Sequence, residues 1–128
     1  MGKWIRAMNE IDYLDEDGYP TDEALDIIAN WWVGSDGRFD NTKSFSELME
    51  FIKPIWWAPD YGWEEKEEPH EIWSEKTVKR WYISTGGWSG NEDIIHAMQS
   101  ADFIWSMNWV QSRRGGHYIF EEYQFAKE

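Results

Sequence analysis

The sequence predicts an α+β fold: a single small domain over residues 1–128, with N-terminal helices followed by a C-terminal β-α-β-β unit that holds a small mixed sheet. Two segments, 21–33 and 44–52, carry apolar residues at helical spacing. After residue 76 the pattern changes to β-rich, alternating segments separated by glycines. A chain of 128 residues with 18% aromatic residues is long enough, and apolar enough, for one core.

The first helix is predicted over Thr21–Val33, after an apolar segment at residues 1–14 and an acidic turn. Thr21 suits the start of a helix and Gly34 suits its end. Leu25, Ile28 and Trp32 follow the i, i+3, i+7 spacing of one buried face.

The second helix is predicted to begin at Ser44, because Ser44 and Glu47 fit a capping box. Its apolar face is Phe45, Leu48, Met49 and Ile52. Pro54 is expected to end or kink this helix.

The C-terminal unit is predicted as a strand at 77–84, a helix at 91–100 and strands at 102–112 and 117–125. Ser89 and Glu92 fit a second capping box. A crossover helix makes the first two strands parallel if they share a sheet, and the Gly115-Gly116 turn makes the last two antiparallel.

Charge divides the chain into an acidic part, residues 1–75, and a neutral part, residues 76–128. The acidic part accounts for the whole net charge of −13, which argues against direct binding of nucleic acid. Such a surface can instead occupy a partner's nucleic-acid groove, or it can simply keep the protein in solution. There is no cysteine, no apolar run of about 18 residues and no secretory signal pattern, so we expect a cytoplasmic protein without disulfides or a membrane span.

Residues 55–75 combine aromatic residues with many glutamates, and two interpretations stay open. The segment is either a solvated loop with a few aromatic anchors or a loop that recognises a partner. For the second interpretation the expected contact residues are Trp56, Trp57, Tyr61, Trp63, Glu64, Glu65, Glu67 and Glu68.

Eleven tryptophans are more than one small core is expected to hide. Trp32, Trp105 and Trp109 lie on apolar faces of predicted elements, so we expect them in the core. The two members of the pairs Trp31-Trp32 and Trp56-Trp57 cannot both point inward on regular structure, so we expect one member of each pair to be exposed or to cover a groove.

The second possible site is a Gly-rich loop between a strand and a helix, together with an Arg-His turn. Backbone N–H groups at a helix start attract anions, and arginine binds phosphate in a fork. The residues expected to bind a nucleotide or another small anion are Ser84, Thr85, Gly86, Gly87, Trp88, Ser89, Asn91, Arg113, Arg114 and His117. The alternative is a tight turn that makes room for the Trp88 ring.

Other chemistries lack a motif. The acidic turn at 15–18 would place Ala24 where a calcium loop needs a bidentate carboxylate. No serine lies in a G-x-S-x-G elbow, and no three metal ligands share a known spacing. We therefore expect no catalytic residue, no metal and no cofactor.

Two stretches resemble a pattern shared by small uncharacterised bacteriophage and prophage proteins. The stretches are ISTGGWSGNE at 83–92 and RGGHY at 114–118, with Phe103, Trp105, Trp109 and Ser112 between them. The segments 15–21 and 51–56 are similar to the same group. The resemblance implies a small accessory protein in a bacterial cytoplasm, of a kind that often binds and blocks host proteins.

Three functions follow as hypotheses. The first is an inhibitor that binds a host defence or nucleic-acid-handling protein, such as a CRISPR effector or a restriction enzyme, through the acidic, aromatic segment. The second is a binder of a nucleotide or similar anion at the Gly-rich loop and Arg-His turn. The third is an enzyme, which no motif supports. A homo-oligomer is possible in each case.

Overall fold

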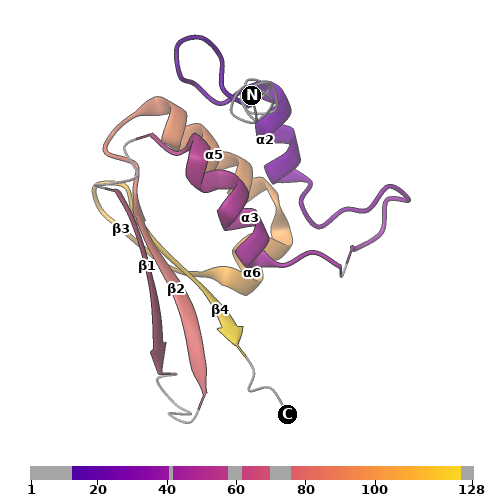
Figure 1. Cartoon of the computed structure of the whole chain (residues 1–128), viewed down its shortest axis with the longest axis vertical. Helices are drawn as coiled ribbons and strands as arrows, with labels where there is room; N and C mark the ends of the chain where they lie inside the picture. Colours follow the sequence, from indigo (N-terminus) through magenta and orange to yellow (C-terminus); the bar gives the residue numbers. More distant parts are fainter. Residues whose placement is uncertain (1–12, 41, 58–61, 70–75, 125–128) are drawn as a thin grey trace, which may run out of the picture.

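The computed structural model describes residues 13–40, 42–57, 62–69 and 76–124. The α+β class is confirmed: four described α-helices accompany a four-stranded sheet (Figure 1). The elements in chain order are α2 (Asp22–Ala29), α3 (Phe45–Ile52), the 3-10 turn η1 (Lys53–Ile55), β1 (Trp63–Pro69), β2 (Thr77–Ser84), α5 (Ser89–Ser100), α6 (Asp102–Asn108), β3 (Trp109–Arg113) and β4 (His117–Gln124). None of these helices is both long and apolar enough to cross a membrane.

The sheet has the strand order β1-β2-β4-β3, and every pair of neighbours is antiparallel. β2 and β3 do run in the same direction, as the crossover predicts, but β4 lies between them. The prediction of a mixed sheet is therefore wrong, because the β3–β4 hairpin folds its second strand against β2. The described helices gather on one side of the sheet, and we call the side without a described helix the open face (Figure 1).

The first predicted helix is shorter than expected. Thr21 caps α2 by accepting a hydrogen bond from the Ala24 N–H at 3.2 Å, but the helix ends at Ala29 instead of Val33. Beyond it the chain turns back, since the Asp40 N–H bonds the Trp32 carbonyl and Val33 bridges Phe39. A short hairpin therefore replaces the last helical turn that the apolar spacing predicts.

The second predicted helix is confirmed, including its capping box. Ser44 accepts from the Glu47 N–H, and the Glu47 carboxylate accepts from the Ser44 N–H. Glu122 of β4 adds a tertiary cap, because its carboxylate accepts from the N–H groups of Phe45 and Ser46. This contact fixes the N-terminus of α3 to the sheet.

Two other segments differ from expectation. Residues 102–108 form α6 instead of the start of a strand, because Ala101, Ile104 and Asn108 are buried at helical spacing. Helix α5 begins at Ser89, with Trp88 as its N-cap and no side-chain capping bond, so the second capping box is wrong.

The core lies between the helices and the covered face of the sheet. Its largest fully buried side chains include Phe45 and Trp81, whose rings pack edge to face at 5.1 Å, and Phe120. One hydrophobic cluster draws residues from both the acidic and the neutral part of the chain. Trp32 is in this cluster as predicted, whereas Trp109 is 38% exposed and stacks on the half-buried Trp105 at 5.8 Å.

Candidate functional site

The Gly-rich loop after β2 and the turn between β3 and β4 meet in space. The Thr85 N–H donates to the Gly116 carbonyl at 2.9 Å. Gly116 has φ +83°, and a Cβ added there would lie 2.3 Å from Thr85 Oγ1. Only glycine permits this close approach, so the turn is shaped to dock against Thr85.

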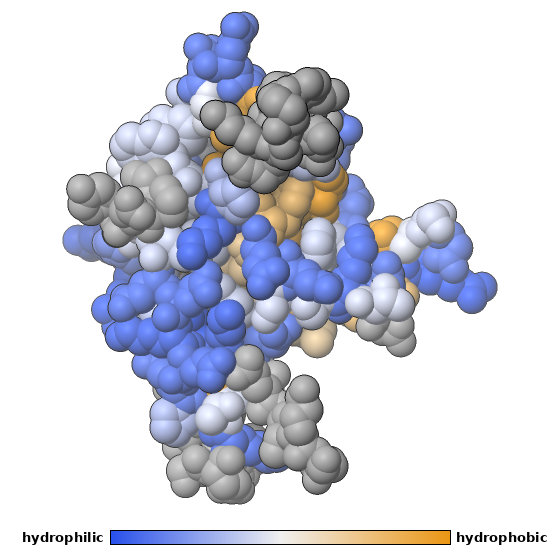
Figure 2. Space-filling model, in the orientation of Figure 1, coloured by the Kyte–Doolittle hydropathy of each residue, from blue (hydrophilic) through white to orange (hydrophobic). Residues whose placement is uncertain are grey.

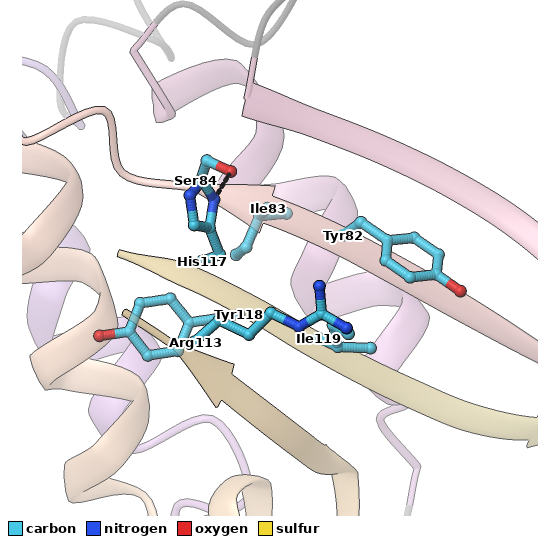
Figure 3. A pocket seen from close by; sticks show the side chains of 7 residues that line it. All are labelled: Tyr82, Ile83, Ser84, Arg113, His117, Tyr118 and Ile119. Carbon is cyan, nitrogen blue, oxygen red and sulfur yellow. Dashed lines mark hydrogen bonds between the residues drawn. The ribbon is translucent and has the colours of Figure 1, made fainter. Parts of the chain in front are cut away.

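Ser84, His117 and Arg113 lie side by side across three strands. Ser84 of β2 is paired with His117 of β4, and His117 is paired with Arg113 of β3. Directly paired residues share a face, and this face is the open one, because Trp81 and Phe120 point to the covered side. Ser84 Oγ lies 2.6 Å from His117 Nδ1 (Figure 3).

These three side chains line a shallow pocket of about 280 Å³. The complete lining is Tyr82, Ile83, Ser84, Arg113, His117, Tyr118 and Ile119. The Arg113 side chain extends along the open face toward Ile119 and Tyr82 (Figure 3). The pocket therefore combines a guanidinium group, an imidazole, a hydroxyl and an aromatic ring.

The positive charge of Arg113 is not neutralised by any carboxylate within the described residues. The nearest acidic side chains on the open face already have partners. Arg80 bonds Glu68 and Glu121, each at 3.0 Å, and the Tyr82 hydroxyl donates to Glu68 at 2.7 Å. The pocket is thus a basic spot on an acidic protein.

This network shifts the ionisation of its members. The hydrogen bond from Tyr82, helped by Arg80, lowers the pKa of Glu68 below its ordinary value. Burial, together with the bond to Glu68, raises the pKa of Tyr82. Burial alone would lower the pKa of Arg80. The hydrogen bonds of Arg80 to Glu121, Tyr82 and Glu68 outweigh burial, so the pKa is raised. The Tyr82 hydroxyl is therefore kept protonated beside the pocket.

The other residues expected at the anion site do not line the pocket. Asn91 is fully buried and bonds the backbone of Trp57 and Thr85, so its role is structural. Thr85 is buried in the docking contact. Gly86, Gly87, Ser89 and Arg114 are exposed outside the lining, and Trp88 packs against other aromatic rings.

Within the acidic segment, Trp63–Pro69 form a strand at one edge of the sheet and not a loop. Trp56 is 2% exposed and belongs to the core, which corrects its assignment to a contact surface. Trp63 is half-buried against Trp56. Tyr61 lies outside the described residues.

The four glutamates of β1 divide into two groups. Glu65 accepts from Trp63 Nε1 and pairs with Lys53 and Lys79, and Glu68 is held by Arg80 and Tyr82. Burial alone would raise the pKa of Glu65, but the Trp63 bond and the two lysines lower it. Only Glu64, which pairs with the neighbouring Lys66, and Glu67 are exposed with no partner on another strand among the described residues, and strand alternation places them on opposite faces of the sheet. Hydrophilic side chains cover this part of the molecule (Figure 2).

Sequence reasoning missed three residues of possible functional importance. Tyr82 and Ile119 lie two residues from Ser84 and His117 on the same strands, so alternation along each strand could have added them. Tyr19, whose ring packs on Trp88 at 4.7 Å, gives no local signal because the contact is purely tertiary.

No group of three or more metal-ligating side chains occurs in the described part of the chain. Comparison with models of protein families, with curated proteins and with solved structures finds no match to this chain.

Proposed function

We propose that the protein binds a small anionic ligand in the pocket on the open face of the sheet. The observation that carries the proposal is the alignment of Ser84, His117 and Arg113 on three neighbouring strands. The Arg113 guanidinium has no carboxylate partner among the described residues, which leaves its donors available to an anion. The strands fix the three backbone positions and the bond to Ser84 orients the His117 ring, so part of the ordering precedes binding.

The pocket favours a phosphate or carboxylate carried by a small planar group. Arg113 suits the anionic oxygens, because guanidinium forks onto phosphate and carboxylate. The Tyr82 ring and Ile119 supply an apolar wall for the remainder of the ligand. A volume of about 280 Å³ is near the lower end of small-molecule sites, so a mononucleotide fits the proposal better than a dinucleotide.

Calorimetric titration of the protein with inorganic phosphate, AMP, GMP and small aromatic carboxylates tests this proposal. We expect saturable binding of at least one compound, and a loss of about tenfold or more in affinity in Arg113→Ala, since a charge-assisted hydrogen bond contributes roughly 1.5–3 kcal/mol. Arg114→Ala is the matched control, because the neighbouring Arg114 carries the same charge outside the pocket lining. Equal losses in both variants, or flat titrations throughout, would reject the site.

A second candidate function is inhibition of a host protein in the bacterial cytoplasm, such as a defence or nucleic-acid-handling enzyme. The position of Glu64 and Glu67 on an edge strand favours it, since both side chains are exposed there, one on each face of the sheet. Pull-down from bacterial lysate with the wild-type protein and with a Glu64→Lys, Glu67→Lys variant tests this function. A partner retained by the wild type and released by the variant supports it, and a partner retained equally by both contradicts it.

A further inference from the structure

Three aromatic side chains from distant parts of the chain pack into one row. The ring centroids of Tyr19 and Trp88 are 4.7 Å apart, and those of Trp57 and Trp88 are 5.6 Å apart with nearly parallel planes. Tyr19 is 37% exposed and Trp57 is 54% exposed. We call these three residues the aromatic shelf. None of them lines the anion pocket.

The exposed Trp57 is held by a buried side chain. Asn91, with no exposed surface, accepts from the Trp57 N–H at 2.8 Å and donates to the Trp57 carbonyl at 3.2 Å. These bonds fix the Trp57 backbone and its ring stacks on Trp88, so an exposed aromatic ring is held in a defined position, as at a contact surface.

Trp88 is fixed by a glycine. A Cβ added to Gly90 would lie 2.1 Å from Trp88 Cζ3, so the ring packs directly over the backbone of α5. The Trp88 carbonyl also accepts the Glu92 N–H, which sets this residue as the N-cap of the helix. The shelf is therefore preorganised.

Acidic residues lie next to two of the shelf residues in the sequence. The segments that carry Tyr19 and Trp88, residues 13–33 and 81–112, contain nine carboxylates and no lysine or arginine. Glu16 and Asp17 are exposed in the turn before Tyr19, and Glu92 and Asp93 are exposed on the first turn after Trp88. Lys53, four residues before Trp57, is paired with Glu65 at 3.8 Å.

We propose that the aromatic shelf receives arginine side chains from a protein partner. Tryptophan is the best aromatic acceptor of a cation, and guanidinium groups stack on its face. The carboxylates next to Tyr19 and Trp88 attract the same cation and repel the phosphates of a nucleic acid, which favours a basic protein segment over a stacked base. The inference goes beyond the anion pocket and needs none of its residues.

Fluorescence anisotropy with a labelled peptide of four Gly-Arg repeats tests the inference. The matched ligand is the same peptide with citrulline in place of arginine, which keeps the planar shape but not the charge. We expect the arginine peptide to bind and the citrulline peptide to bind at least about tenfold more weakly. In Trp57→Ala the affinity for the arginine peptide should fall about fivefold or more, since a cation–π contact contributes on this scale.

Trp109→Ala is the matched protein variant, because it also removes an exposed tryptophan without changing charge. It should alter the affinity less than about twofold if the ring contact is specific. Equal affinities of Trp57→Ala and wild type for the arginine peptide would show that binding depends on net charge alone, and would overturn the inference. Equal affinities of the wild type for the arginine and citrulline peptides would also overturn it. Movement of the Trp57 indole N–H resonance of the wild-type protein on titration supports it independently of any variant, and an unmoved resonance contradicts it.

Discussion

Ser84 Oγ and His117 Nδ1 are 2.6 Å apart, and the two residues are direct cross-strand partners. The pair stands at the end of β2 and the beginning of β4, where the two glycine turns dock. The bond fixes the imidazole against the hairpin turn: a Cβ on Gly115 would lie 3.3 Å from His117 Nε2. The ring orientation at the pocket thus depends on a hydroxyl from the neighbouring strand.

Ser84→Ala removes that hydroxyl and frees the imidazole. We expect the affinity for the anion that binds wild type in calorimetry to fall about threefold to tenfold, because one neutral hydrogen bond contributes about 1 kcal/mol. The free energy of unfolding should change by less than about 1 kcal/mol at this partly exposed position. Ser89→Ala, an exposed serine outside the pocket, is the control and should bind as wild type does.

Asn91→Ala should lower the free energy of unfolding by about 2–4 kcal/mol, because it leaves the N–H and carbonyl of Trp57 without their side-chain partner and removes one of the two hydrogen bonds to the Thr85 carbonyl. Urea denaturation measures the change. Asn30→Ala removes one exposed hydrogen bond from the side-chain amide to the Asp26 carbonyl, so it should lower the free energy of unfolding much less. A small effect of Asn91→Ala would contradict the assigned structural role.

Gly116→Ala combines two costs: a positive φ and a clash with Thr85 Oγ1. We expect it to destabilise the protein by about 2–4 kcal/mol. Gly86→Ala has the positive φ but open space around the added Cβ, so it should cost only about 1 kcal/mol. Thr85→Ala in the Gly116→Ala background should recover part of the difference in thermal denaturation, and no recovery would reject the clash.

Glu122→Ala removes the carboxylate that accepts from two backbone N–H groups of α3 and from the Ser46 hydroxyl. The expected loss is about 1–3 kcal/mol in the free energy of unfolding, since the bonds to this carboxylate are charge-assisted. Glu50→Ala, on the exposed side of the same helix, is the control. Equal stability of the two variants would show that the tertiary cap contributes nothing.

Stability should fall in acid through the β1 glutamates. The pKa values of Glu68 and Glu65 are lower in the folded protein than their ordinary value of 4.5. A lowered folded pKa means that the stabilisation is present above pH 4.5 and is lost as the pH falls through the folded pKa. Glu68→Gln should reduce the slope of unfolding free energy against pH in this range, and an unchanged slope would exclude Glu68 as a contributor.

Local signals explain which elements the sequence predicts well. The capping box of α3 depends on residues three apart, so Ser44 and Glu47 identify it without knowledge of the fold. For α6 the alternating apolar residues satisfy a strand pattern as well, and only packing of Ile104 and Asn108 selects the helix. β1 has no comparable local signal, because its stabilising partners, Lys79 and Arg80, lie on another strand.

The candidate site was predictable in part for the same reason. Arg113 and His117 carry side chains that can bind an anion in any fold, and the adjacent glycines indicate a turn. Whether the turns meet depends on β4 lying between β2 and β3, which is a matter of strand order. The shelf residue Tyr19 depends on packing across distant segments and leaves no trace in local sequence.

The two edges of the sheet differ in composition but share a physical effect. β1 presents charged side chains along its length, and β3 is five residues long with an irregular register between Trp109 and Gln111. The charged side chains on one edge hinder the addition of a strand from another chain. On the other edge, the short strand and its bulge have the same effect. A protein with 11 tryptophans would otherwise be at risk of cross-β aggregation while it is synthesised. The glutamates of β1 therefore act as gatekeepers of solubility, whatever partner or ligand the protein binds.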